Sequence, residues 1–322
     1  MPHFTLAYDM RAPEFGAKPV DLYRAAIEQS AWADKLGCHS VSLMEHHASD
    51  DGYLPSPIVL GSAIAARTSQ TLISVGVMLL PLYDPLRAAE DLAVLDIIAE
   101  GRLRLVVGAG YRESEYAQFG LSLRKRPSLM ERGIDTLKKA WTGEPFEFEG
   151  RTVRILPRPV QSPRPAISMG GSSKASAERA ARIADGYFPV SLELFEHYRE
   201  TLAAMGKPVP EPITRRAHYP FLYVARNPDA AWERIAPHAL HETNSYGRWL
   251  REASTDYASF KEVTDPGELR ASATYKVVTP EECIELYKKD GTLSFKPLMG
   301  GLDPDFAWES LKLFETEVLP RL

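Results

Sequence analysis

Short apolar runs alternate with amphipathic segments along most of the chain, and this rhythm constrains the fold more than any other feature. Such a succession favours a parallel sheet, because each helix carries the chain back across a sheet face. The predicted strands cover residues 4–8, 40–44, 72–79, 103–107, 166–169, 186–190, 217–225 and 293–299. The predicted helices cover residues 20–36, 57–67, 86–99, 129–141, 176–184, 194–205, 230–239 and 304–319. Eight strands and eight helices predict a single α/β domain over residues 1–322, a TIM (β/α)8 barrel.

The rhythm breaks in two places, so we expect the barrel to carry two insertions. The first insertion, residues 143–165, follows the fourth helix. Within it, residues 146–158 alternate apolar and polar side chains around Glu149-Gly150, which predicts a β-hairpin. Residues 228–278, after the seventh strand, begin as a helix and then lose a clear period. The aromatic and amide residues of 241–249 favour equally a lid over an organic molecule and a surface helix packed on the barrel.

Composition narrows the partners that the protein can have. The net charge of −5 argues against a nucleic-acid partner, since such proteins carry a basic surface. No stretch approaches the ~18 consecutive apolar residues of a membrane span, and no secretory signal is evident at the N-terminus. Two cysteines, Cys38 and Cys283, are far apart, which favours buried reduced thiols. We therefore expect a cytoplasmic protein.

Glu45-His46-His47 follows the second predicted strand directly. The carboxyl ends of parallel barrel strands are where such enzymes place their chemistry. Histidine changes protonation near neutral pH, so one of these imidazoles is predicted to act as an acid, a base or a hydrogen-bond donor. Two hydrogen-bonded core histidines are the structural alternative. Metal ligands are a weaker one, because no third ligand at a recognised spacing is evident.

Two glycine-rich loops follow other predicted strands. Gly108-Ala109-Gly110-Tyr111 leaves room for a flat ligand against the backbone, and Tyr111 can stack or hydrogen-bond. Met169-Gly170-Gly171-Ser172-Ser173 leads into a helix, where unpaired N–H groups and the helix dipole favour a phosphate. An ordinary capped turn is the alternative there, and residues 299–302 form a rival phosphate loop.

Taken in order, these motifs resemble the bacterial luciferase-like flavin monooxygenases. The resemblance rests on Glu45-His46-His47, on the segments 76–96, 101–102, 108–111, 119–120, 170–173 and 184–186, and on 279–282 and 313–320 near the end of the chain. It covers nearly the whole chain except roughly residues 210–275. It implies a barrel that binds reduced FMN, or the related 8-hydroxy-5-deazaflavin coenzyme, at its carboxyl-end mouth.

The resemblance also implies roles for individual residues. His46 looks like the family's active-site histidine, with His47 or Glu45 orienting it. Met78 falls where the family often has a non-proline cis peptide under the flavin ring. The remaining implied cofactor contacts are Gly108, Gly110 and Tyr111 along the flavin, Gly171, Ser172 and Ser173 at the phosphate, and Arg126 as the phosphate arginine.

The implied function is a two-component monooxygenase that oxidises a small organic substrate with dioxygen and reduced FMN. A separate NAD(P)H-dependent reductase would supply the flavin, since no Gly-x-Gly-x-x-Gly follows a predicted strand. A homodimer is also family behaviour. Light emission is not expected, because Gly108 and Ala109 stand where luciferase carries cysteine and arginine. The alternatives are a deazaflavin-dependent hydride-transfer enzyme, a non-catalytic flavin-binding protein and a metal hydrolase.

Overall fold

The computed structural model describes residues 2–213, 219–253, 260–272 and 274–322. The chain divides into two compact units. The first unit comprises residues 1–55, 67–71 and 215–322, and the second comprises residues 56–66 and 72–214. The organisation of the whole chain as one domain stays a prediction.

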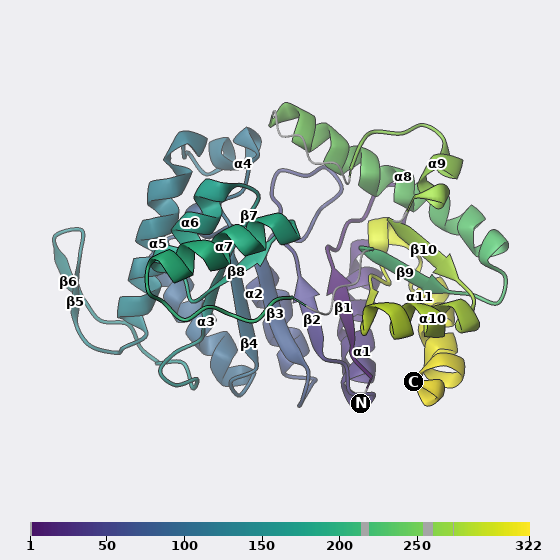
Figure 1. Ribbon diagram of the computed structural model, residues 1–322, viewed down its shortest axis with the longest axis horizontal. Coiled ribbons are helices and arrows are strands. Elements are labelled where there is room, and N and C mark those ends of the chain that lie inside the picture. The colour runs from purple at the N-terminus through teal and green to yellow at the C-terminus, as the bar shows by residue number, and fades with distance from the viewer. Residues whose placement is uncertain (1, 214–218, 254–259, 273) are drawn as a thin grey trace. The chain divides into compact units, whose positions relative to one another are not determined.

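The first unit holds three parallel strands with β1 (Phe4–Tyr8) in the middle. On one side β1 pairs with β2 (Ser40–Leu43), and on the other with β11 (Leu293–Phe295). The helix α1 (Pro19–Lys35) carries the chain from β1 to β2 and runs beside β1 (Figure 1). Because the three strands are parallel, the segments that follow them emerge at one edge of this sheet.

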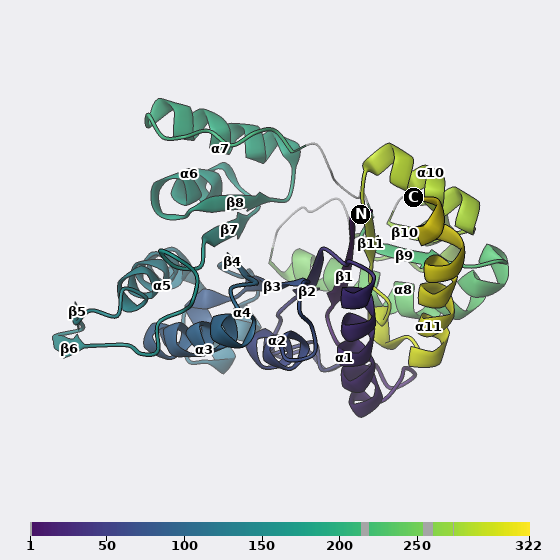
Figure 2. The same ribbon diagram turned by 90° about the horizontal axis from the view of Figure 1, so that it is seen from below.

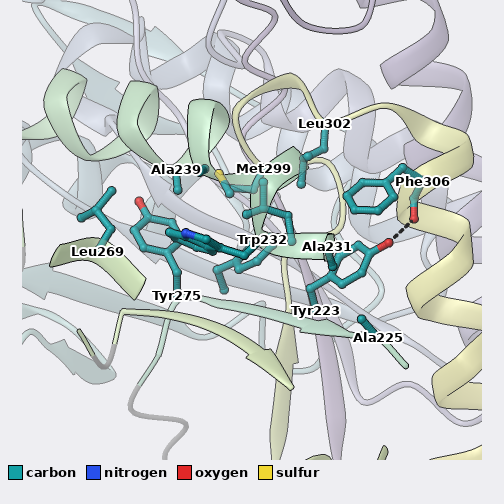
Figure 3. Packing of buried hydrophobic residues seen from close by; sticks show 13 residues of the cluster. Tyr223, Ala225, Ala231, Trp232, Ala239, Leu269, Tyr275, Met299, Leu302 and Phe306 are labelled. Atoms are coloured by element: carbon teal, nitrogen blue, oxygen red, sulfur yellow. Dashed lines mark hydrogen bonds between the residues drawn. The ribbon is translucent and has the colours of Figure 1, made fainter. Parts of the chain in front are cut away.

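The rest of the first unit packs around a second parallel ladder, formed by β9 (Phe221–Val224) and β10 (Tyr275–Val278). Its helices are α8 (Pro228–Glu252), α9 (Pro266–Ala271), α10 (Pro280–Asp290) and α11 (Pro304–Leu313), and α11 continues into a π-helical turn over Phe314–Val318. Figure 3 shows the core between them, where the ring of Tyr223 stacks on Phe306 at 4.6 Å. The hydroxyl of Tyr223 donates to the Phe306 carbonyl at 2.8 Å, so this buried polar group is satisfied.

The second unit holds four parallel strands in the order β3, β4, β7 and β8. They are β3 (Leu72–Met78), β4 (Leu103–Val107), β7 (Ile167–Gly171) and β8 (Gly186–Pro189). Its helices are α2 (Pro57–Ala65), α3 (Pro85–Ile98), α4 (Glu113–Gln118), α5 (Arg126–Ala140), α6 (Lys174–Ile183) and α7 (Leu192–Ala204).

The predicted hairpin is confirmed. β5 (Phe146–Phe148) and β6 (Arg151–Val153) pair antiparallel and project beyond α5 (Figure 2). Glu149 and Gly150 both take positive φ, 49° and 75°, as a two-residue hairpin turn with the favoured twist requires.

The parallel α/β architecture is confirmed, but the strand predicted at 217–225 differs from the expectation. Residues 217 and 218 lie outside the described residues, and the strand begins at Phe221. Its ladder partner is β10, a strand that the sequence pattern did not predict, so an eighth strand of one closed barrel is not shown. The second predicted insertion is also more regular than expected, since α8 continues from Pro228 to Glu252.

Candidate functional site

The first unit places Glu45-His46-His47 just beyond the carboxyl end of β2, as the sequence predicts. The three side chains are buried, with exposed fractions of 3%, 8% and 9%. His47 donates through Nε2 to Oε1 of Glu45 at 2.7 Å. A carboxylate accepts only, so this hydrogen bond requires the proton on Nε2 and sets the orientation of the His47 ring.

His46 lies among aromatic rings. Its ring centroid is 4.9 Å from that of Tyr53, edge to face, and 4.9 Å from that of Trp249. Tyr246 lies at 6.1 Å, and its hydroxyl shares a 2.8 Å hydrogen bond with the hydroxyl of Tyr53. The imidazole is therefore enclosed by apolar ring surfaces, in which proton transfer and hydrogen bonding are shielded from water.

Arg11, three residues after β1, occupies the same aromatic cluster. Its side chain is fully buried, and its Cζ lies 4.6–4.7 Å from the ring centroids of Tyr53, Tyr246 and Trp249. Nη1 of Arg11 donates to Asp51 at 2.7 Å. The planar guanidinium can form a charge-assisted hydrogen bond with Asp51 and contact the faces of aromatic rings at the same time.

Asp51 contacts a histidine in addition to Arg11. Its Oδ2 lies 2.7 Å from Nε2 of His241, a residue of α8. Burial alone would raise the pKa of Asp51, but the hydrogen bond from His241 and the positive charge of Arg11 hold that pKa well below its usual range. Asp51 is therefore an anion at any pH near neutrality.

A further buried group lies at the end of β11. Lys296 pairs with Asp9 at 2.7 Å and with Glu242 of α8. Burial alone would lower the pKa of Lys296, but the carboxylates of Asp9 and Glu242 raise it well above the ordinary value. The hydroxyl of Tyr275 donates to Glu242 at 3.0 Å. The carboxyl ends of β11, β1 and β2 thus each contribute charged side chains to one buried cluster.

Sequence reasoning missed this cluster, although part of its signal was available. Asp9 and Arg11 closely follow the first predicted strand, so a search for charges at strand ends would have found both. Lys296 lies inside the strand predicted at 293–299, whereas the observed β11 ends at Phe295. Their partners on α8 gave no such signal, because Glu242 and His241 lie in the segment without a clear period.

The second unit places Gly108 of the predicted flavin segment and Gly170 of the predicted phosphate turn beside Val77. The non-proline cis bond joins Gly76 to Val77, one bond before Met78, and the Gly108 N–H donates to the Met78 carbonyl at 2.8 Å. A Cβ on Gly108 would lie 2.2 Å from Cγ1 of Val77, and one on Gly170 would lie 3.3 Å from Cγ2. Because Gly108 and Gly170 have no Cβ, the side chain of Val77 fits between them at the ends of β3, β4 and β7.

Arg126 is brought to the predicted flavin loop. It is the first residue of α5, and its Nη1 donates to the carbonyl of Gly110 at 3.0 Å. Gly110 has φ of 66°, which glycine adopts without steric cost. Tyr116 donates to the Ala109 carbonyl at 2.5 Å, and Tyr111 is partly buried. The structure therefore joins Gly110 to the head of α5, which the sequence left separate.

The predicted phosphate turn joins β7 to α6. Ser173 caps the helix, since its Oγ accepts from the Ser176 N–H at 3.2 Å and Ser176 Oγ accepts in return at 3.1 Å. Tyr187 holds the turn by donating to the Gly171 carbonyl at 2.9 Å. Ser172 and Lys174 are exposed. A hydroxyl, a lysine and a helix N-terminus are a donor set that suits a phosphate.

The rival glycine loop, η3 (Met299–Gly301), is buried instead. His238 of α8 and the Gly300 carbonyl share a 2.7 Å hydrogen bond. A Cβ on Gly300 would lie 2.8 Å from the His238 carbonyl oxygen. Its glycines therefore permit close packing of α8.

Two absences hold for the described part of the chain as a whole. None of its helices is both long and apolar enough to cross a membrane. Within the same ranges, no three His, Cys, Asp or Glu side chains gather so that they could hold a metal ion.

Sequence and structure comparisons identify the relatives of this chain. Residues 5–289 match the family described as luciferase-like monooxygenase. The chain is 27% identical over 168 residues to the oxygenase component of the flavin-dependent trigonelline monooxygenase of Acinetobacter baylyi, an alignment that covers 50% of this chain and 46% of that protein. It is 25% identical to the F420-dependent glucose-6-phosphate dehydrogenase of Nakamurella multipartita, with 100% of this chain and 97% of that protein covered.

The chain spans about half the length of several curated relatives that it matches. Among solved structures, it resembles the oxygenating constituent of 3,6-diketocamphane monooxygenase from Pseudomonas putida, determined in complex with FMN. The TM-score is 0.74 at 20% identity, with 100% of this chain and 99% of that chain covered. At this identity the likeness supports a shared fold.

Proposed function

Because this chain belongs to the luciferase-like monooxygenase family of oxidoreductases, we propose that it is the oxygenase component of a two-component, FMN-dependent monooxygenase. The observation that carries the proposal is the buried His46, enclosed by aromatic rings at the carboxyl end of β2. When bound, reduced FMN supplies two electrons and a ring that reacts with dioxygen. A cytoplasmic location and a separate flavin reductase belong to the same proposal.

The residues of the second unit fit the chemistry of such a cofactor. Ser172 and Ser173 at the head of α6 would bind the phosphate, with Gly171 allowing the close approach of the turn. Arg126 would add a positive charge. The flavin ring would lie against residues that include Met78, Gly108, Gly110 and Tyr111.

In the first unit, His46 would hold or transfer a proton, or donate a hydrogen bond, during oxidation of the substrate. The hydrogen bond between Glu45 and His47 would fix the backbone at His46, which lies between them in the chain. The rings of Tyr53 and Trp249 would keep water from the reacting atoms. The substrate class proposed is a small organic molecule.

A second candidate is a deazaflavin-dependent oxidoreductase, which would transfer a hydride and need no dioxygen. The full-length alignment to a dehydrogenase named for F420, the deazaflavin coenzyme, favours it. His46 and the turn at residues 171–173 are each compatible with either coenzyme.

We also propose that the protein is a homodimer through α2 and α3. Val59 on α2 is 70% exposed, and α3 exposes Val94, Ile97 and Ile98. Apolar side chains gathered on two adjacent helices favour burial against a second copy.

Replacement of His46 tests the proposed function. The purified protein would be supplied with FMN, NADH, a flavin reductase and a panel of small organic substrates. We expect the wild type to form an oxygenated product, and His46→Ala to bind reduced FMN with unchanged Kd but to form almost none. Product formation by His46→Ala at the wild-type rate would remove His46 from the proposal. Failure of both proteins to bind any flavin would remove the function itself.

A further inference from the structure

One aromatic cluster in the first unit encloses two different groups. Tyr53, Tyr246 and Trp249 surround the imidazole of His46, and the same three rings contact the guanidinium of Arg11. The rings come from distant parts of the chain, because Tyr53 follows β2 whereas the other two lie on α8. Arg11 itself follows β1, so its guanidinium brings a third segment into contact with the two that carry these rings.

The partners of Arg11 hold its guanidinium in one place. Nη1 is bound to Asp51 at 2.7 Å, and Nε lies 3.5 Å from the carboxylate of Asp9. Within the described ranges Nη2 has no hydrogen-bond acceptor, although it is buried. The ion pairs of Arg11 do not by themselves explain why three aromatic rings surround its guanidinium. Through its contacts with those rings, the guanidinium reaches the surroundings of His46.

We propose that Arg11 is a positioning residue for His46. The proposed role does not require Arg11 to contact the cofactor or the substrate. Its flat guanidinium keeps the rings of Tyr53, Tyr246 and Trp249 together, and these rings fix the orientation of the His46 imidazole. The consequence for catalysis rests on the proposed function, but the positioning itself does not.

Arg11→Lys separates shape from charge. Lysine keeps the positive charge beside Asp51 and Asp9 but loses the planar group that contacts three rings. Arg234→Lys is the matched control, because Arg234 also lies on an aromatic ring, 3.7 Å from the centroid of Phe306. Arg234 lies on α8, as Tyr246 and Trp249 do, but its ring partner Phe306 is not part of the aromatic cluster around His46.

The readout is the proton NMR resonance of the His46 imidazole, identified as the histidine signal that His46→Gln removes. In the wild type and in Arg234→Lys, ring currents from Tyr53 and Trp249 should displace this resonance from the position of an exposed histidine. In Arg11→Lys it should move toward that position or broaden. If Arg11→Lys does not fold, Asp51→Asn, which removes the negative charge that holds Nη1 of Arg11, should produce the same change.

A folded Arg11→Lys or Asp51→Asn whose His46 resonance stays within the spread of the wild type and Arg234→Lys would overturn the proposal. Turnover gives a second readout. Arg11→Lys should lower kcat roughly 10- to 100-fold, as small misplacements of reacting groups do, while the Kd for reduced FMN stays within about twofold of the wild-type value. Displacement of the resonance in a protein that binds no flavin would support the positioning role and refute the proposed function, so the two failures are distinguishable.

Discussion

His47 donates a 2.7 Å hydrogen bond from Nε2 to Oε1 of Glu45, two residues earlier, and both side chains are buried. His46 lies between them in the chain and contacts Tyr53 and Trp249 instead. The pair therefore holds the backbone from which the His46 side chain extends. This relationship gives Glu45 a testable role that does not require it to touch the substrate.

Glu45→Gln keeps the size of the side chain at position 45 but should change the orientation of residues 45–47. The neutral amide weakens the charge-assisted hydrogen bond to His47, so we expect kcat to fall roughly 10- to 100-fold with the flavin Kd unchanged. Glu178→Gln is the control, because Glu178 forms the comparable but more exposed 3.0 Å contact with His197. Steady-state kinetics with a coupled reductase would measure both. Equal kcat values for Glu45→Gln and Glu178→Gln would contradict the role of Glu45.

Arg126 should recognise the phosphate of the cofactor. Replacement by glutamine removes the charge, and we expect it to weaken FMN binding about tenfold while riboflavin, which has no phosphate, binds as before. Arg124→Gln provides the comparison at a more exposed arginine two residues earlier. Fluorescence titrations of each variant with both flavins give the Kd values. Equal weakening of FMN and riboflavin binding would refute the phosphate contact.

Gly108→Ala should disturb the packing of Val77. The added Cβ would lie 2.2 Å from Val77 Cγ1, so the chain must shift, at a cost of about 1–3 kcal/mol in the free energy of unfolding. Val77→Ala in the same protein should restore most of that loss, because it removes the methyl group in conflict. Urea denaturation of the wild type, both single variants and the double variant measures the coupling. Additive effects in the double variant would show that the two residues do not conflict.

Asp34 should make stability depend on pH. Burial alone would raise its pKa, but the backbone N–H groups of Thr71, Gln70 and Ser69 lower it from 3.8 to about 2. A lowered folded-state pKa contributes stability above the unfolded-state value, and that contribution is lost as pH falls through about 2.

Asp34→Asn should therefore destabilise the protein at pH 7, and its difference from the wild type should shrink as pH falls below 4 toward 2. Denaturant midpoints across this range measure the difference, with Asp21→Asn as the control at an exposed ion pair. A destabilisation that stays constant from pH 7 to pH 2 would contradict a contribution from the charge of Asp34.

The periodic parts of the fold could be predicted from the sequence, and the α8 region could not. Strands such as 103–107 are apolar apart from the exposed Arg104, so their pattern alone identifies them. On α8 the buried face includes Glu242, Thr243 and Ser245, whose polar groups make an apolar period invisible. Their burial depends on partners such as Lys296, 54 residues away, which no local pattern can supply.

The candidate site divides in the same way. The triplet at 45–47 and the turn at 170–173 could be found because short motifs at strand ends carry them. The aromatic surroundings of His46 could not be found in this way, because they include Trp249, which lies more than 200 residues later in the chain. Val77 was overlooked for another reason, since its importance lies in what Gly108 and Gly170 lack.

Whether the coenzyme is FMN or the deazaflavin decides between the two proposed functions, and one anaerobic titration distinguishes them. The purified protein would be titrated separately with reduced FMN and with the reduced deazaflavin coenzyme, and each complex then mixed with air-saturated buffer while oxygen is recorded. We expect micromolar or tighter binding of reduced FMN, at least tenfold weaker binding of the deazaflavin, and oxygen consumption by the FMN complex. Tight binding of the deazaflavin alone, without oxygen consumption, would contradict the monooxygenase and establish the hydride-transfer alternative.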